Sequence, residues 1–505
     1  MSLADAHPFD LPRLLAGFTE TTPPAIAVGG LVHDSRHIQA GDGFIALRGQ
    51  RVHGLAHAGQ AIQNGCAAIL YEPQGGGTEL AGAIASVPCV PVADLAGKIG
   101  PIADRFFGEP SRGFDALIGI TGTNGKTSCS HFLAQALDNS SAVLGTLGWG
   151  RPGALQPTTH TTPDAIEVHR ILGELLGLGF RSVAMEASSH GLEQGRLNGV
   201  RFKGALYTNF TRDHLDYHGS MEAYLEAKLR LLAWPGLEFV VFNADDASAE
   251  TILARKPSAV RAIGFGKTGR ERQSSLPFLE IREVRHETGG VSFVAHYAGA
   301  SARVRAPVFG DYNVENLAAT LGVLLALGWD LAPAADALGR VRAVPGRMES
   351  FAGHGRHVVV DYAHTPDALA SVLRSLRGHC AGRLWVVFGC GGDRDRGKRP
   401  QMGAIAEQLA DHVVLTDDNP RSEDGDAILR DILTGCRRDG LVCLRDRRAA
   451  IAHALEHAAP EDLVLVAGKG HESTQEIQGH KYPFSDRQVI QALLTTLPFS
   501  TTRSL

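Results

Sequence analysis

The sequence predicts an α/β protein of three domains. The chain has 505 residues, which corresponds to about three domains of roughly 150 residues each. From about residue 101 onward, short runs of apolar residues alternate with stretches of helical spacing. This alternation is typical of βαβ units and parallel sheets. A glycine-rich turn joins one apolar run to the next helical stretch and indicates a phosphate-binding loop.

Changes in this pattern divide the chain. Residues 1–100 carry short apolar runs among glycine-rich turns and predict a small mixed domain. Residues 101–345 predict a central parallel sheet, and a new alternation after Pro345 predicts a second α/β domain at 346–505. The expected strands are 115–121, 181–188, 204–210 and 238–244 in the central domain, and 357–363, 384–390, 412–418 and 462–470 in the last. No role is assigned to the tail, 499–505.

The composition excludes several classes of protein. Hydrophobic residues make up 44% and charged residues 20%, which are ordinary values for a globular protein. The formal net charge of -5 argues against a large nucleic-acid surface. The seven cysteines are scattered without a CxxC pair, so we expect neither a zinc site nor a disulfide framework, and a reducing compartment. We find no signal peptide and no apolar stretch that could span a membrane, and therefore expect a cytoplasmic protein.

The phosphate loop is the strongest local signal. It comprises Gly122, Thr123, Asn124, Gly125, Lys126 and Thr127, between a predicted strand and a predicted helix. Glycines and a helix N-terminus suit a phosphate group. Lys126 would then reach the β- and γ-phosphates, and the Thr127 hydroxyl would bind Mg²⁺. Ile120 stands where the longer GxxxxGK[ST] pattern has glycine, so the loop has the shorter GxxGKT form. The alternative is an ordinary glycine-rich turn.

Further polar residues follow the neighbouring strands. Glu186 ends one strand, where ligands bind in open α/β sheets, and a carboxylate suits Mg²⁺; it could equally be a surface residue. Residues 208–219, TNFTRDHLDYHG, gather two Asp and two His, which predicts either a metal site or a solvated turn. Lys228 stands alone in a helical stretch, where lysine is usually solvated.

Six segments, in this order along the chain, resemble signatures of the Mur ligase family: GITGTNGKT, MEASSHGL, TNFTRDHLDYHG, GDYNVENLAA, PGRME and DYAHTPD. The resemblance extends over essentially the whole chain. It implies an ATP-dependent, amide-forming ligase of bacterial peptidoglycan synthesis, acting as a monomer. It also implies one domain each for a UDP-sugar peptide, for ATP and for an amino acid, the last one Rossmann-like. A substrate carboxylate would attack ATP to form an acyl phosphate, which an amine would then attack.

The resemblance gives roles to the ambiguous residues. Lys228 matches a lysine that CO₂ converts to a carbamate, N6-carboxylysine, which can hold a second Mg²⁺. His214 matches the other ligand of that ion, and Glu186 matches a ligand of the first. The remaining ATP contacts implied are Asn313 and Asn316 for adenine, Arg347 for the γ-phosphate and Asp361 for ribose, with His364 nearby. Asn313 and Asn316 could instead cap a helix, and Arg347 could form a linker salt bridge.

The resemblance also implies the sites for the other two substrates. For the UDP-sugar peptide these are Ser35, Gln50, Arg51, Val52, Thr161, Thr162, Ser188, Gln194 and Arg196. For the amino acid they are Arg394, Asp418, Asn419, Pro420, Arg421, Gly468 and Glu472. The DNPR sequence at 418–421 resembles the branch that adds meso-diaminopimelate to UDP-N-acetylmuramoyl-L-alanyl-D-glutamate. Arg421 can bind the second carboxylate, which lysine lacks, in bidentate fashion. Without the family, Arg421 would be expected to pair with Asp418.

Three alternative functions remain open at this stage. The chain could be the same ligase acting on L-lysine. It could be a folylpolyglutamate synthetase, although the DNPR and GGDRD segments argue against that. It could also be a nucleotide-dependent scaffold without catalysis, in which case ATP turnover would not depend on an acceptor amine.

Overall fold

The computed structural model describes residues 8–49, 51–267, 276–287, 289–438 and 441–496. Gln50 and the tail 499–505 lie outside these residues. The described part divides into two compact units, the first formed mainly by residues 1–266 and the second mainly by 279–321 and 330–505. Each unit is described by itself. No described helix is long and apolar enough to cross a membrane. The seven cysteines all lie within the described residues, and none of them forms a disulfide.

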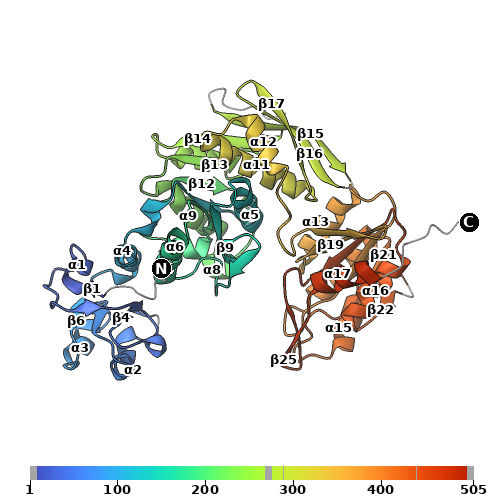
Figure 1. Ribbon diagram of the computed structural model, residues 1–505. Coiled ribbons are helices and arrows are strands. Elements are labelled where there is room, and N and C mark those ends of the chain that lie inside the picture. Colours follow the sequence, from blue (N-terminus) through green and yellow to red (C-terminus); the bar gives the residue numbers. More distant parts are fainter. Residues whose placement is uncertain (1–7, 50, 268–275, 288, 439–440, 497–505) are drawn as a thin grey trace, which may run out of the picture. The chain divides into compact units, whose positions relative to one another are not determined.

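The first unit begins with a small sheet of four parallel strands, seen in blue in Figure 1. Its strands are β3 (Leu31–Val32), β4 (Gly43–Ala46), β5 (Ala68–Tyr71) and β6 (Cys89–Pro91), in that order. A separate antiparallel pair joins β1 (Phe9–Asp10) to β2 (Ala27–Val28). The accompanying helices are α1 (Leu11–Leu15), α2 (Ala58–Gln63), α3 (Gly77–Gly82) and α4 (Leu95–Phe106). Apolar side chains of β4, β5 and α4 share one core.

The central sheet of the first unit has a parallel middle. β8 (Ser141–Gly145), β11 (Ser182–Glu186), β7 (Ala116–Thr121), β12 (Gly204–Tyr207), β13 (Phe239–Asn243) and β14 (Arg261–Lys267) lie side by side in that order. The antiparallel strands β9 (Gly148–Arg151) and β10 (Ala154–Gln156) extend its β8 edge. The helices are α5 (Lys126–Ala136), α6 (Ala165–Gly177), α7 (Ser189–Glu193), α8 (Leu215–His218), α9 (Met221–Leu229) and α10 (Ala249–Arg255). All residues of this parallel middle are buried except Ser182, Arg261 and Lys267, which stand at strand ends, as expected for a sheet covered on both faces.

The second unit contains an antiparallel group that the sequence patterns did not predict. It consists of β15 (Phe278–Glu287), β16 (Gly290–Tyr297) and β17 (Ala300–Ala306). Helices α11 (Asp311–Ala326) and α12 (Leu331–Leu338) follow in the chain.

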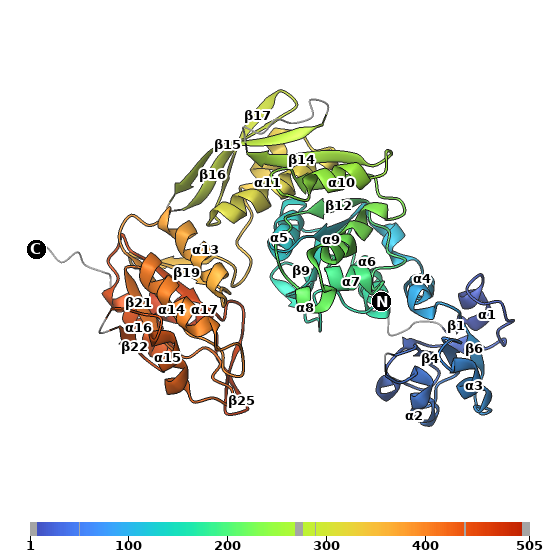
Figure 2. The same ribbon diagram turned by 180° about the vertical axis from the view of Figure 1, so that it is seen from behind.

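A six-stranded sheet forms the rest of the second unit. Its order is β18 (Glu349–Gly353), β19 (Arg356–Asp361), β23 (Leu463–Ala467), β20 (Leu384–Phe388), β21 (His412–Leu415) and β22 (Val442–Cys443). Only β18 is antiparallel to its neighbour. Helices α13 (Pro366–Arg377), α14 (Lys398–Leu409) and α15 (Gly425–Leu433) pack on one set of alternating strand residues. Helices α16 (Arg447–His457) and α17 (Asp486–Thr496) pack on the other set, and thus on the opposite face (Figures 1 and 2).

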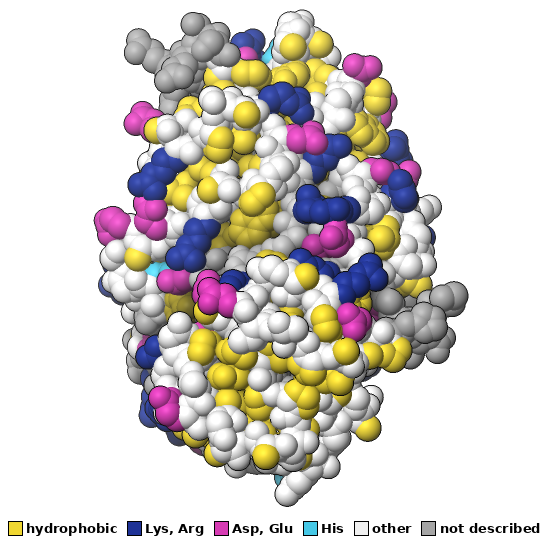
Figure 3. Space-filling model, turned by 90° about the vertical axis from the view of Figure 1, so that its left-hand side faces the viewer, with side chains coloured by type: hydrophobic (Ala, Val, Ile, Leu, Met, Phe, Trp, Pro, Cys, Tyr) yellow, Lys and Arg dark blue, Asp and Glu magenta, His cyan; other side chains and the backbone are white. Residues whose placement is uncertain are grey.

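A hairpin completes the second unit. It is formed by β24 (Thr474–Ile477) and β25 (His480–Pro483), which form a two-stranded sheet of their own, and one isolated bridge joins Ile477 of β24 to Arg421. The parallel sheets and the three-domain α/β organisation agree with the sequence prediction. On the face drawn in Figure 3, basic and acidic side chains are interspersed rather than gathered by sign.

Candidate functional site

The phosphate loop connects β7 to α5, as predicted. Gly122 has a φ of +146°, and a Cβ atom there would lie 1.9 Å from Thr208 Oγ1, so the position requires glycine. Gly125 has a φ of +85° and precedes the first residue of α5. Asn209 Oδ1 accepts a hydrogen bond from the Asn124 amide (2.9 Å), and Thr208 Oγ1 donates one to the Asn124 carbonyl (2.6 Å). The end of β12 thus fixes the loop that follows β7.

Lys126 lies against this loop. Its Nζ atom donates hydrogen bonds to the carbonyl oxygens of Gly122 (2.8 Å) and Thr123 (2.9 Å). These two hydrogen bonds keep one cationic group at the N-terminus of α5, where the helix dipole also favours an anion. This arrangement suits the polyphosphate of a nucleotide.

Glu186 is a buried carboxylate at the end of β11 and not a surface residue. Only 1% of it is exposed, and Thr146 donates to it from both its amide and its hydroxyl, each at 3.0 Å. Burial raises the pKa of Glu186, while the charge of Lys126 and hydrogen bonds from Thr146 and Thr127 act in the opposite direction. A buried carboxylate with these neighbours is strongly favoured as a cation ligand.

Lys228 is also buried, with 2% exposed. Its Nζ atom donates to the Gly122 carbonyl at 2.8 Å and lies 4.4 Å from the ring centre of Tyr224. Burial lowers the pKa of Lys228 well below its usual value, and the charge of Lys126 adds to that effect. The expectation of a solvated lysine is therefore wrong at this position. A neutral amine is the form that reacts with CO₂.

Tyr224 joins the predicted residues to one another. Its hydroxyl lies 3.2 Å from Thr123 Oγ1 in the phosphate loop. Its ring lies 5.9 Å from the ring of His214 and beside Lys228 on the same helix. His214 is half exposed, has a φ of +51° and precedes α8. His214 and Lys228 thus flank one aromatic ring next to the loop.

The side-chain oxygen atoms beside the phosphate loop could supply some of the ligands of a Mg²⁺ ion. Thr127 and Glu186 provide hard oxygen atoms within hydrogen-bond contact of each other, and Mg²⁺ is usually held by one or two carboxylates together with substrate phosphates and water. Within the described residues, no three His, Cys, Asp or Glu side chains gather as a metal cage. An ion held by these two side chains would take its remaining ligands from phosphate oxygens and water.

The predicted peptide contacts of the first unit surround Glu186. Thr162 Oγ1 donates to the Glu186 carbonyl (2.9 Å) and accepts from the Ser188 amide (3.1 Å). Arg196 donates to the Thr162 carbonyl at 2.8 Å and to Gln194 Oε1. Thr161 and Thr146 share a hydrogen bond of 3.0 Å. These five predicted residues therefore form one polar network beside the phosphate loop.

The predicted uridine contacts are less connected. Ser35 is buried and donates to Gln60 Oε1 at 2.8 Å. Arg51 is exposed, and Val52 is 55% exposed.

In the second unit, Asp361 ends β19 and is buried. Its two carboxylate oxygens accept hydrogen bonds from the amides of Met348 and Ala363, both at 2.8 Å. Burial raises the pKa of Asp361, and the Arg347 charge partly offsets this. The Arg347 guanidinium lies 4.8 Å from the ring centre of Tyr362.

Asn313 and Asn316 are buried in the first turns of α11. Asn313 Nδ2 donates to the Phe309 carbonyl (2.8 Å), and Asn316 Nδ2 donates to Asn313 Oδ1 (3.1 Å). Because α11 begins at Asp311, both residues lie inside the helix and neither occupies the N-cap position that the alternative interpretation required.

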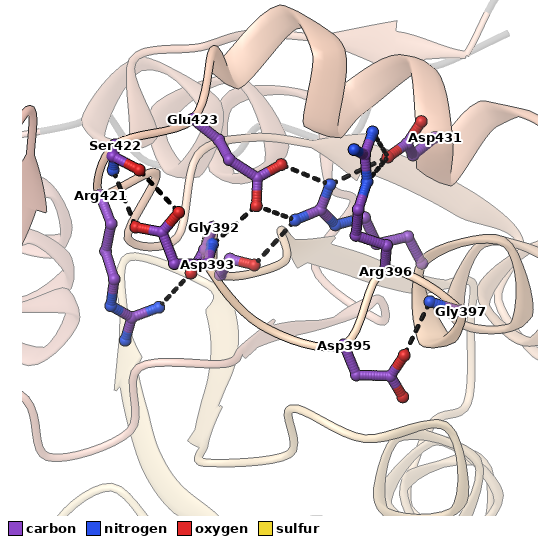
Figure 4. A network of polar contacts seen from close by, with 11 residues as sticks. Gly392, Asp393, Asp395, Arg396, Gly397, Arg421, Ser422, Glu423 and Asp431 are labelled. Atoms are coloured by element: carbon purple, nitrogen blue, oxygen red, sulfur yellow. Dashed lines mark hydrogen bonds and ion pairs between the residues drawn. The ribbon is translucent and has the colours of Figure 1, made fainter.

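Arg421 lies in the loop that follows β21 and contacts the loop that follows β20 (Figure 4). Its Nη1 atom donates to the Gly392 carbonyl at 2.6 Å, and Nε lies 3.6 Å from Glu476 Oε2. A Cβ atom on Gly391 would meet both Arg421 Nη1 (2.9 Å) and Arg394 Cγ (3.6 Å), so the two predicted arginines adjoin the same residue. The expected Arg421–Asp418 pair is replaced by these contacts.

A buried arginine holds the two loops together. Arg399, with no exposed side-chain surface, binds Glu423 and Asp431 at 2.8 and 2.9 Å. Glu423 accepts from the Asp393 amide (2.6 Å), and Asp393 accepts from the Ser422 hydroxyl (2.6 Å), as Figure 4 shows. The loop carrying Arg394 is thereby fastened to the segment carrying Arg421.

Lys469 lies among the predicted polar and acidic residues of the same region. This fully buried ammonium donates to Asn419 Oδ1 and Glu472 Oε2, both at 2.9 Å. Asn419 Nδ2 also donates to Glu472 at 2.9 Å. Gly468 has a φ of +113°, and a Cβ there would lie 2.4 Å from Asp418 Oδ2. The predicted side chains of Asp418, Asn419 and Glu472 therefore lie in one region, and Arg394 and Arg421 lie on adjoining loops.

The fold and these sites define a nucleotide-dependent enzyme of the phosphate-loop class, with a second α/β sheet that can receive a zwitterionic molecule. Sequence comparisons make the assignment specific: the chain belongs to the Mur ligase family. Residues 27–107 match the family model "Mur ligase family, catalytic domain", residues 120–324 match "Mur ligase middle domain", and residues 346–470 match "Mur ligase, glutamate ligase domain".

Individual relatives are similar over nearly their whole length. The UDP-N-acetylmuramoyl-L-alanyl-D-glutamate–2,6-diaminopimelate ligase of Alkalilimnicola ehrlichii is 48% identical over 92% of this chain and 95% of its own. The Pseudomonas aeruginosa protein of that name is 48% identical over 90% and 93%. A solved structure of a ligase with the same name has 35% identity and a TM-score of 0.74, covering 97% of this chain and 99% of that one.

Four important residues had not been singled out from the sequence. Tyr224, Thr146, Arg399 and Lys469 position predicted residues and have no predicted role themselves. Lys469 lies between the predicted residues Gly468 and Glu472, so these neighbours could have indicated it. Tyr224 precedes Lys228 by one helical turn, a spacing that places both on one helix face.

Proposed function

We propose that the chain adds meso-2,6-diaminopimelate to UDP-N-acetylmuramoyl-L-alanyl-D-glutamate at the expense of ATP, in peptidoglycan precursor synthesis. The observation that carries this proposal is the 48% identity to diaminopimelate ligases over more than nine-tenths of the chain. The arrangement of Arg421 and Arg394 on adjoining loops supports it. ATP and the nucleotide sugar are cytoplasmic metabolites, so the reaction takes place in the cytoplasm. The chain acts as a monomer.

The first step creates a leaving group. An oxygen of the D-Glu γ-carboxylate attacks the γ-phosphorus of ATP, and ADP leaves with the electrons of the broken P–O bond. The loop amides and Lys126 bind the phosphates and stabilise the charge that moves onto ADP. The peptide carboxylate is held beside Glu186 by Thr161, Thr162, Ser188, Gln194 and Arg196.

The second step forms the amide. The diaminopimelate amine attacks the acyl carbon, the carbonyl re-forms as inorganic phosphate leaves, and the amine loses a proton to water. Glu472 and Asp418 bind an ammonium group of the amino acid, while Arg421 and Arg394 bind its distal carboxylate. The nucleotide is contacted by Asn313, Asn316, Arg347 and Asp361. The uridine diphosphate is contacted by Ser35, Gln50, Arg51 and Val52.

Two Mg²⁺ ions neutralise phosphate charge when they are bound. Thr127 and Glu186 would hold one ion. His214 would hold the other together with Lys228 in its carbamate form, which CO₂ and the neutral amine would give with release of a proton to water. The burial of Lys228 and its lowered pKa support this modification.

The product identifies the reaction directly. Purified protein is incubated with ATP, Mg²⁺, the UDP-sugar dipeptide and meso-diaminopimelate, and the nucleotide-sugar product is analysed by mass spectrometry. The tripeptide product supports the proposal. Its absence, together with glutamate added to a folate substrate, would assign the chain to the folate-dependent relatives instead.

A further inference from the structure

Arg421 has an unusual backbone conformation. Its φ is +51°, in the left-handed region that residues with a side chain rarely adopt. Two backbone hydrogen bonds hold it there: the Arg421 amide donates to the Glu476 carbonyl at 3.0 Å, and the Gln478 amide donates to the Arg421 carbonyl at 2.6 Å. Both partners belong to the hairpin of β24 and β25 or its turn. The direction of the Arg421 side chain therefore depends on that hairpin.

The hairpin also holds the residues that precede Arg421. The Glu476 amide donates to Asn419 Oδ1, and Gln475 Nε2 donates to the Asp418 carbonyl, both at 2.9 Å. The Glu476 carboxylate lies 3.6 Å from Arg421 Nε. The segment that discriminates the amino acid in the proposed function is thus tied along its length to β24.

The hairpin has little other support. All of β25 is exposed, and no residue of β24 is fully buried. A cavity of about 590 Å³, lined in part by Gln475, Ile477 and Pro483, lies against it. An isolated two-stranded hairpin is only marginally stable, so its turn strongly affects whether it forms. That turn is the two-residue pair Gln478 and Gly479, with φ values of +49° and +75°, as in a type I′ turn.

We propose that the β24–β25 hairpin is a specificity element, which positions Arg421 to select an amino acid that carries a distal carboxylate. The inference rests on the proposed function for the identity of that amino acid. It assigns positioning roles to the backbone of Glu476 and Gln478. No residue of the hairpin turn is assigned to a substrate.

A glycine substitution in the turn tests this inference. Gly479 has a positive φ, and nothing lies within 4 Å of a Cβ atom placed there, so Gly479→Val strains the turn without a steric clash. Gly299 provides a matched control. It closes the β16–β17 hairpin, its φ is +83°, it also has nothing within 4 Å, and Ala298 before it has a φ of +50°.

Two readouts are compared in the full-length protein, and thermal unfolding confirms that both variants are folded. Steady-state kinetics give KM and kcat with meso-diaminopimelate and with L-lysine. Hydrogen exchange gives the protection of the amides in residues 419–422. If Gly479→Val does not fold, Gly479→Ala replaces it, with Gly299→Ala as its control.

Gly479→Val is expected to raise the KM for diaminopimelate about tenfold, which corresponds to 1.4 kcal/mol, with kcat changed less than about threefold. The preference for diaminopimelate over lysine falls by a similar factor, exchange at 419–422 accelerates, and Gly299→Val changes none of these. Unchanged hydrogen exchange at 419–422 in Gly479→Val would overturn the inference. Faster exchange with an unchanged preference for diaminopimelate over lysine would overturn it as well. Wild-type protein inactive with both amino acids would refute the proposed function instead, and the exchange data would still decide whether the hairpin holds Arg421.

Discussion

The Nζ atom of Lys228 donates a 2.8 Å hydrogen bond to the carbonyl oxygen of Gly122, 106 residues earlier in the chain. A residue at the end of α9 thereby contacts the first residue of the phosphate loop. The bond places the amine proposed for carbamylation directly beside the site proposed for the nucleotide phosphates.

Lys228→Ala is expected to reduce kcat by about 10²–10³-fold, the usual effect of removing one charged group from a preorganised site. Added short carboxylic acids should restore part of the activity, because they replace the carbamate. Lys203→Ala is the matched control, since Lys203 also donates to a backbone carbonyl, that of Asp115, but is solvent-accessible. A wild-type protein that shows no carbamate signal with ¹³C-labelled CO₂ would argue against the modification.

Gly122→Ala is expected to abolish the thermal stabilisation that ATP provides, because its Cβ would lie 1.9 Å from Thr208 Oγ1 and displace the loop. Ligand-induced stabilisation follows affinity, so a shift assay with ATP and Mg²⁺ measures the change. Gly153→Ala is the control, since Gly153 has a φ of +92° with nothing within 4 Å. Equal ATP stabilisation in both variants would contradict the assignment of the loop.

Arg421→Leu is expected to raise the KM for diaminopimelate about 100-fold, because truncating one partner of a charged pair typically costs 2–5 kcal/mol. The kinetics with L-lysine should change much less. Arg374→Leu, at an exposed position of α13, serves as the control. Equal losses with both amino acids would show that Arg421 has a structural role only.

Lys469→Met tests the electrostatics around Glu472. Burial raises the pKa of Glu472, but Lys469 and hydrogen bonds from Asn419 and Lys469 outweigh burial, and the pKa is lowered overall. Without Lys469 this pKa rises, so the carboxylate protonates at higher pH. The acid limb of kcat/KM for diaminopimelate should therefore move to higher pH. It should not move in the control Lys98→Met, which removes a lysine of α4 that donates to the Phe18 carbonyl (3.3 Å).

Glu423→Gln tests the loop network of Figure 4. The Arg399 side chain lowers the pKa of Glu423 to about 2. A carboxylate with a lowered pKa contributes stability above its unfolded pKa and loses it as the pH falls through the folded value. The variant should be less stable than wild type at pH 7, by about 1 kcal/mol after allowance for solvent screening. The difference should disappear between pH 4.5 and about 2. A pH-independent difference in urea unfolding would exclude this origin.

The sequence predicted the parallel strands well, because their apolar runs are long and uninterrupted. It overestimated some strand ends. The strand expected at 204–210 ends at Tyr207, and the next two residues contact β7 and the phosphate loop through both backbone and side-chain hydrogen bonds. The antiparallel strands β15–β17 escaped prediction, since their half-exposed pattern contains many charged residues.

Motifs predicted the position of two segments in the fold, the phosphate loop after β7 and the DNPR segment after β21. Burial was not predictable, because it depends on tertiary packing. Nothing local in α9 shows that Lys228 is inaccessible to solvent or that Tyr224 joins the loop to His214. Likewise, Lys469 and Arg399 are buried cations, and each has a partner from a segment distant in sequence, Asn419 and Glu423 respectively.

Phosphate release from ATP in the presence of UDP-N-acetylmuramoyl-L-alanyl-D-glutamate, with meso-diaminopimelate and L-lysine added in parallel, tests the central claim most directly. We predict rapid release with diaminopimelate and little with lysine. Equal or faster release with lysine would contradict the assignment of Arg421 as the selective residue, and release that needs no amino acid would contradict the ligase reaction itself.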